Sequence, residues 1–183
     1  MMDEEADGKS GQKPQEEDIE LVVDAPDWEE NPIIQKLRAQ FPEDMGEVAA
    51  TGHCVDELTV QISKERIVEI CCFLREDSEL RFDYLSDLSG VDYPEREKRF
   101  EVVYHLYSIS KAHRVRLKVQ IGEEEKVPTV TGVWKTADWH EREAFDLLGI
   151  PFEDHPDLRR ILLSDDWKGH PLRKEYPLAG DED

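Results

Sequence analysis

Strict alternation of apolar and polar residues marks two segments near the middle of the chain, residues 100–108 and 114–121. A period of two puts successive side chains on opposite faces, so both segments are predicted to be β-strands with one buried face. The link through residues 110–113 predicts that they pair as a hairpin. In the second strand one face carries Val115, Leu117, Val119 and Ile121. The other face carries Arg114, Arg116, Lys118 and Gln120.

The second of these faces is basic, although the chain as a whole is acidic. A solvated sheet face accounts for such a pattern. The alternative is an electrostatic contact with an acidic partner protein. The sequence leaves both open.

Apolar residues spaced three and four apart predict amphipathic helices over residues 32–41, 64–75 and 139–148. Asn31 is the expected N-cap of the first helix, with Pro32 at its first position. The second helix is expected to pack on the sheet. These three segments supply the helical part of the fold.

The third helix carries its own start and stop signals. Asp138 and Glu141 have the spacing of a capping box at its N-terminus, and Gly149 is placed to cap its C-terminus. Arg142 lies four residues before Asp146, so these two are expected to pair on one helical face.

The remaining strands are shorter or less regular. Residues 48–51 and 58–62 are predicted to be two strands joined by a turn, and apolar residues over 82–92 lead into the hairpin. Residues 127–133 form a further apolar run, which Pro128 limits to an edge or an entry. The resulting order predicts an α+β fold, with a mixed or antiparallel sheet of about five strands covered by helices.

Composition divides the chain into three parts. Residues 1–30 are rich in Asp and Glu and poor in large apolar residues, which predicts a disordered acidic tail, or in the sharper alternative an acidic docking arm. Residues 31–149 form the α+β domain. Residues 150–183 contain recurrent prolines among large apolar and basic residues, which predicts an extended docking arm, ordered chiefly where a partner protein covers it.

Charge restricts the possible partners. The chain carries 44 acidic and 23 basic residues, a formal net charge of −21. Such a charge repels nucleic acids and anionic lipids, so any membrane contact should pass through another protein. No apolar run approaches the roughly 20 residues of a membrane-spanning helix, and the N-terminus lacks the features of a targeting signal. The three cysteines form no CxxC motif and are too few for an iron–sulfur cluster.

Carboxylates beside an arginine, as at residues 141–146, also occur in sites of acid–base catalysis or metal binding. A zinc-protease motif fails, because the position four residues after His140 is Ala144 rather than histidine. His155 and His170 lie too far along the chain to supply a close ligand pair. We therefore expect no metal site here.

A more specific pattern runs through residues 139–178. It comprises Glu141-Arg142-Glu143, Asp146-Leu147-Leu148, His155, Arg159 and Ile161, then Asp165-Asp166-Trp167, Gly169-His170-Pro171-Leu172-Arg173 and Tyr176-Pro177-Leu178. In order and spacing this pattern resembles the signature of the 30-kDa (C) subunit family of NADH-quinone oxidoreductase, respiratory complex I. Several fixed positions over this stretch argue against coincidence.

The resemblance implies a structural subunit in the peripheral arm of a proton-translocating NADH-quinone oxidoreductase. In that family an α+β domain is followed by an arm that lies over the 49-kDa (D) subunit, and the B and I subunits are expected neighbours. NADH, FMN, iron–sulfur clusters and quinone belong to other subunits, so this chain is expected to hold no cofactor and no active site. The implied location is the cytoplasmic side of the bacterial inner membrane, reached through the complex.

The resemblance further implies that the signature residues form a subunit interface and position the arm, rather than catalyse or bind a cofactor or metal. Breaking an interface ion pair from one side costs roughly 2–5 kcal/mol. Arg142→Ala and Arg159→Ala are therefore expected to impair assembly. The full set is Glu141, Arg142, Glu143, Asp146, His155, Arg159, Arg160, Trp167, His170, Arg173 and Tyr176.

The sequence leaves other functions open. One alternative is the equivalent subunit of a related membrane-bound hydrogenase or of an oxidoreductase with another electron donor. An unrelated acidic adaptor could use the same arm, and co-purification from membranes would separate it from the respiratory subunit. The rival from another class is an independent carboxylate enzyme or metal-dependent hydrolase centred on residues 140–146, which bound metal or turnover of the purified chain would reveal.

Overall fold

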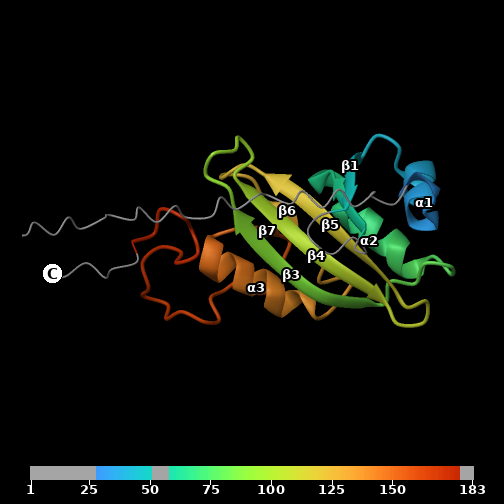
Figure 1. Cartoon of the computed structure of the whole chain (residues 1–183). Coiled ribbons are helices and arrows are strands. Elements are labelled where there is room, and N and C mark those ends of the chain that lie inside the picture. The colour runs from blue at the N-terminus through green and yellow to red at the C-terminus, as the bar shows by residue number, and fades with distance from the viewer. Residues whose placement is uncertain (1–27, 51–57, 178–183) are drawn as a thin grey trace, which may run out of the picture.

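The computed structural model describes residues 28–50 and 58–177 (Figure 1). The predicted tail over residues 1–30 thus lies outside the described residues, apart from its last three. The elements are η1 (Trp28–Glu30), α1 (Pro32–Gln40), β1 (Met45–Ala50), β2 (Leu58–Ile62), η2 (Lys64–Arg66), α2 (Ile67–Glu76), β3 (Tyr84–Asp92), β4 (Phe100–Ser108), β5 (His113–Ile121), β6 (Val127–Pro128), α3 (Ala137–Leu148) and β7 (Phe152–Glu153).

One five-stranded sheet organises the fold, with the strand order β1-β2-β5-β4-β3 (Figure 1). β4 and β5 form the predicted hairpin, with Phe100 opposite Ile121 and Ser108 opposite His113. β2 pairs with β5 in parallel, whereas the other pairs are antiparallel. The predicted α+β class with a mixed sheet is confirmed.

The sequence of the edge strand β3 lacks a clean period of two, and the irregular pairing of this strand explains why. Its pairing with β4 shifts between Leu85 and Asp87, which is a β-bulge or a similar irregularity. An extra residue at such a point interrupts the alternation of faces. The buried residues Leu85 and Leu88 are consequently three apart.

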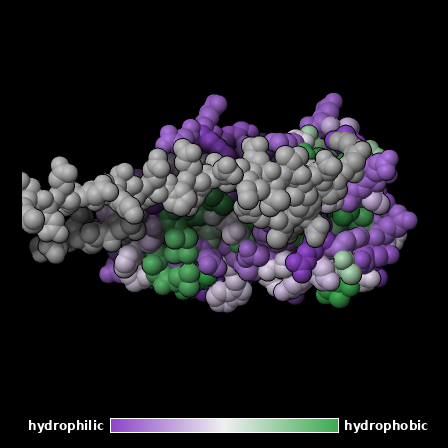
Figure 2. Space-filling view, viewed as in Figure 1, coloured by the Kyte–Doolittle hydropathy of each residue, from purple (hydrophilic) through white to green (hydrophobic). Residues whose placement is uncertain are grey.

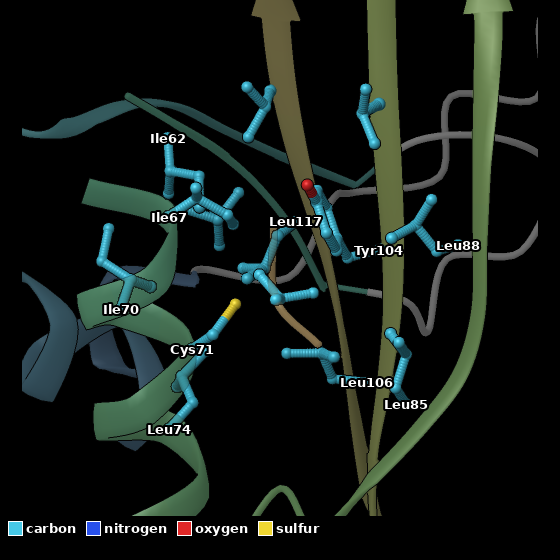
Figure 3. Packing of buried hydrophobic residues seen from close by; sticks show 14 of the residues in the cluster. Ile62, Ile67, Ile70, Cys71, Leu74, Leu85, Leu88, Tyr104, Leu106 and Leu117 are labelled. Atoms are coloured by element: carbon cyan, nitrogen blue, oxygen red, sulfur yellow. The ribbon is translucent and has the colours of Figure 1, made fainter. Parts of the chain in front are cut away.

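Helix α2 packs its apolar stripe on one face of the sheet, as predicted. Figure 3 shows the side chains of this stripe directed toward the central strands. Ile67, Ile70, Cys71 and Leu74 of α2, and Tyr104, Leu106 and Leu117 of the sheet, are all essentially inaccessible to solvent. Asn31 caps helix α1 as expected, because its side chain accepts a hydrogen bond from the N–H of Ile33 at 2.9 Å.

Helix α3 lies along β3 (Figure 1) and adds Ala137, Ala144 and Leu148 to the same core cluster. The close approach depends on Gly90 of β3, since a Cβ atom there would lie 2.5 Å from Cδ1 of Leu148. Within residues 28–50 and 58–177 we find no helix with the length and apolar character that a bilayer crossing requires.

On the opposite face of the sheet, part of the basic stripe is paired within the chain. Nζ of Lys118 lies 2.8 Å from Oε1 of Glu101, whose side chain is 4% exposed. The Arg114 guanidinium lies 5.3 Å from the centre of the Tyr107 ring. The neighbouring strand β4 thus provides an acidic partner for this stripe.

Of the predicted apolar run at residues 127–133, only Val127–Pro128 is a strand. It pairs in parallel with Phe152–Glu153 in a separate two-stranded sheet, and the residues that follow it form turns. After β7 the chain has no helix or strand through residue 177. The predicted C-terminal arm with little regular structure is confirmed.

Candidate functional site

Helix α3 begins at Ala137, so Asp138 lies within it and the predicted capping box is wrong. Glu141 is instead turned toward the segment that precedes the helix. Its carboxylate accepts hydrogen bonds from the N–H of Val130 at 2.8 Å and from the Thr129 hydroxyl at 2.5 Å. The Glu141 side chain is completely buried, and a buried carboxylate requires donors wherever the tertiary structure brings them.

Asp146 is the main anchor of the arm. One carboxylate oxygen accepts the backbone N–H groups of residues 161–163 at 2.8–3.0 Å, and the other lies 2.9 Å from Nη1 of Arg160. The predicted ion pair between Arg142 and Asp146 is therefore wrong. Arg142 donates from Nε to the carbonyl of Arg159 at 3.2 Å. The side chains of Arg142 and Asp146 both face the arm, because its backbone supplies hydrogen-bond partners that the helix surface lacks.

These contacts also explain the electrostatics of Asp146. Burial alone would raise the pKa of its carboxyl group. The three backbone N–H donors and the Arg160 guanidinium outweigh burial and hold that pKa below its usual range. The carboxylate is thus stable in its charged form, with its oxygens occupied by the arm.

The C-terminal end of α3 is also covered by the arm. Gly149 caps the helix in the left-handed conformation with φ +76°, as predicted. Nδ1 of His170 lies 2.9 Å from the carbonyl of Asp146, and Nε of Arg173 donates to the carbonyl of Leu148 at 2.7 Å. The last carbonyls of a helix lack intrahelical donors, so the arm satisfies them.

The far end of the arm is fastened to the β3–β4 connection. Asp92 accepts from Nε of Arg99 at 2.8 Å and from the backbone N–H of Lys174 at 2.8 Å. Arg99 also pairs with Glu175 of the arm. Hydrogen bonds from Arg99, opposed in part by burial, hold the pKa of Asp92 below its usual range.

Sequence reasoning missed this second fastening point. Asp92 and Arg99 stand at a strand end and before the next strand, where charged residues are common. Lys174, which bonds Asp92, is 82 residues away from it in the sequence, and the arm partner of Arg99 is Glu175. No local signal links positions so distant in sequence.

The predicted interface arginines differ in their exposure. Arg142 is 7% exposed, and its guanidinium lies 5.0 Å from the centre of the Trp139 ring. The Arg159 side chain is 71% exposed and pairs with Asp157 at 2.9 Å. Arg142 therefore has a structural role within the chain, whereas Arg159 is accessible.

The outer side of α3 and the arm carries large apolar side chains. Trp139 is 62% exposed, Leu162 60%, Leu172 55% and Trp167 44%. Figure 2 shows a hydrophobic area at the side of the molecule where the arm lies. Of the remaining predicted residues, Glu143 is exposed and Tyr176 donates from its hydroxyl to the carbonyl of Lys168 at 3.4 Å.

The arrangement is chemically suited to holding a segment of chain. The carboxylates of Glu141 and Asp146 are both buried, and both already accept backbone hydrogen bonds. Within the described part of the chain, no group of three or more His, Cys, Asp or Glu side chains is placed to hold a metal ion. The arm is thus in contact with its own domain at several points.

Comparison with sequence families gives a match over most of the chain. The family model described as respiratory-chain NADH dehydrogenase, 30 Kd subunit, matches residues 60–182. The C subunit of NADH-quinone oxidoreductase from Roseiflexus sp. is 48% identical over 151 residues, which are 82% of this chain and 85% of that protein. The protein of the same name from Geotalea uraniireducens is 50% identical over 153 residues, which are 83% and 90% of the two chains.

A solved structure has a similar fold. It is described as the membrane-bound sulfane sulfur reductase, an archaeal respiratory membrane complex. One of its chains aligns with a TM-score of 0.66 and 21% identity, over 80% of this chain and 84% of that chain. At this identity the likeness shows the fold alone.

Proposed function

Since this chain belongs to the family of the 30-kDa subunit of respiratory-chain NADH dehydrogenase, we propose that it is a cofactor-free structural subunit of NADH-quinone oxidoreductase. It binds the 49-kDa (D) subunit through its C-terminal arm. Its contribution to electron transfer from NADH to quinone is architectural, because FMN, the iron–sulfur clusters and the quinone site belong to neighbouring subunits.

The observation that supports this role is that one side of the arm is fastened to the domain, whereas its other side exposes large apolar side chains. Its backbone and its buried polar groups are fastened to α3 and to the β3–β4 connection. Leu162, Trp167 and Leu172 of the same segment are exposed. Large apolar groups on a rigidly held segment are typical of the buried centre of a protein interface.

The proposed location follows from the same assignment. The subunit lies in the peripheral arm of the complex, on the cytoplasmic side of the bacterial inner membrane, beside the B and I subunits as well as the 49-kDa one. A formal net charge of −21 opposes direct contact with anionic lipid. The membrane is therefore reached through the other subunits.

Leu162→Asp is expected to reduce binding of the 49-kDa subunit by roughly tenfold or more, because it places a charge in the apolar centre of the proposed interface. The measurement is the amount of 49-kDa subunit that co-purifies with the tagged full-length chain from membranes. Ile109→Asp is the matched control, since Ile109 is equally exposed at 64% but lies in the β4–β5 turn. Equal recovery with both variants would contradict the proposed surface.

Arg159→Ala provides a second test of the same surface. Its side chain is largely exposed and its pair with Asp157 is a surface ion pair, which contributes little to folding. A loss of 49-kDa subunit from the purified complex would therefore report on the interface. Normal assembly with lost quinone reduction would show instead that Arg159 takes part in catalysis.

A second candidate is the equivalent subunit of a related complex with another electron donor. The fold likeness to a chain of an archaeal respiratory membrane complex favours considering it. Identification of the proteins that co-purify with this chain separates the two. A flavin subunit that oxidises NADH supports the first proposal, and a hydrogenase subunit supports the second.

A further inference from the structure

A hollow of about 100 Å³ lies between helix α3 and strand β3. β3 forms one edge of the five-stranded sheet, and α3 lies along it (Figure 1). Apolar side chains from both elements and from the arm line the hollow, namely Leu88, Ala144, Leu147, Leu148 and Leu172. Three segments that are far apart in the sequence therefore build one apolar depression at the surface.

Contacts within the chain fix both ends of this hollow. At one end Nδ1 of His140 in α3 lies 3.7 Å from Oδ1 of Asp87 in β3. At the other end the backbone N–H of Leu172 donates to the carbonyl of Leu147 at 3.0 Å, which ties the arm to α3. A depression whose walls are already in place loses little conformational freedom when a partner fills it.

The size of the hollow restricts what it can hold. A cavity of roughly 150 Å³ holds a benzene ring, so about 100 Å³ suits one aliphatic side chain rather than an aromatic one. The surroundings are apolar as well, because Trp139 and Leu172 are both largely exposed. Apolar groups gathered around a concave apolar site favour an apolar occupant.

The rim of the hollow carries two carboxylates. Glu143 of α3 is exposed, and the side chain of Asp87 in β3 is 50% exposed. His140 beside Asp87 is the nearby titratable group, and among the described residues that line the hollow none is lysine or arginine. A negative rim favours an occupant that has a basic residue next to its apolar side chain, and it repels an acidic one.

We propose that this hollow receives one aliphatic side chain of the 49-kDa subunit, from a segment in which a neighbouring lysine or arginine pairs with Glu143 or Asp87. The identity of the partner rests on the proposed function, whereas the chemistry of the occupant rests on the hollow and its rim. The interface then extends from the arm, past Leu172, onto α3 and β3.

Charge reversal at the rim tests the electrostatic part of this proposal. Glu143→Lys should lower the amount of 49-kDa subunit that co-purifies with the tagged full-length chain from membranes by roughly fivefold at about 0.1 M salt. The deficit should shrink at about 0.5 M salt, because salt screens exposed charges. Glu124→Lys is the matched control, since Glu124 is also exposed but lies in the turn after β5. Equal recovery with the two variants would overturn the role of the rim.

Leu147→Lys tests the apolar part, because it places a positive charge in the wall that should receive the aliphatic side chain. Recovery of the 49-kDa subunit should fall roughly tenfold at both salt concentrations. A photoreactive aromatic residue in place of the exposed Trp139 should capture a peptide of the 49-kDa subunit in which lysine or arginine neighbours an aliphatic residue. Capture of a peptide from another subunit, or of one without a basic residue, would overturn the proposal.

Leu162→Asp separates failure of this proposal from failure of the proposed function. If Leu162→Asp lowers recovery of the 49-kDa subunit while Glu143→Lys and Leu147→Lys leave it unchanged, the hollow is overturned and the 49-kDa partner stands. If all three variants recover the wild-type amount, both the hollow and the proposed partner are overturned.

Discussion

Asp146→Ala is expected to detach the arm from helix α3 and to lower the free energy of unfolding by roughly 2–4 kcal/mol. The substitution removes the acceptor of three consecutive backbone N–H groups, at residues 161–163, and the partner of Arg160. These groups must then remain without a hydrogen-bond partner or move out to water, and either outcome weakens the packing of the arm against α3.

Urea denaturation of the purified chain measures the global effect, and limited proteolysis within residues 155–165 measures local release of the arm. Asp157→Ala is the control, because Asp157 is an exposed carboxylate of the arm that pairs with the exposed Arg159. Asp146→Asn should be intermediate, since one amide oxygen can still accept the three N–H groups. If all three variants behaved alike, Asp146 would not be the anchor.

The same anchor predicts a dependence on acid. The pKa of Asp146 is held below its usual range in the folded chain. A lowered pKa stabilises the fold above the ordinary value near 3.9, and this contribution is lost as the pH falls through the lower folded value. Asp146→Asn should therefore lie below the wild type in stability at neutral pH and approach it in strong acid.

Gly149→Ala is expected to have an effect of similar size, roughly 2–4 kcal/mol, by a different route. Gly149 adopts φ +76°, where a side chain is strained. Its Cβ atom would also lie 2.6 Å from the His170 ring and 2.8 Å from Nη2 of Arg173. The substitution therefore displaces the two residues that fasten the arm to the end of α3.

Urea denaturation and hydrogen exchange over residues 170–176 measure this effect. Gly132→Ala is the control, because a Cβ atom at Gly132 would meet nothing within 4 Å. A Gly149→Ala chain as stable as the Gly132→Ala chain would show that the arm adjusts to the new side chain without loss.

Local periodicity was sufficient for most of the elements. The alternation in β5 and the helical stripe of α2 both report on a single buried face, and the structure buries those faces. The cap residues Asn31 and Gly149 act on their own helix ends, so their roles are local as well. β3 was harder to predict because an irregularity in its pairing with β4 interrupts its pattern.

The polar contacts of the site show the opposite behaviour. Glu141 has the spacing of a capping residue, yet it bonds Val130, which is eleven positions earlier. Asp146 has a neighbouring arginine on its helix, yet it pairs with Arg160. Helix positions four residues apart are close in any helix, but a buried carboxylate selects the donors that burial leaves without other partners.

By itself, the sequence determined the α+β class, the position of the helices and the hairpin, and the signature in residues 139–178 that marks the family. These features depend on side chains that are near one another along the chain. Only the tertiary structure decided that the arm after helix α3 is fastened to Asp146 and Asp92. Those contacts join residues up to 82 positions apart, where the path of the folded chain, and no local pattern, sets the distance.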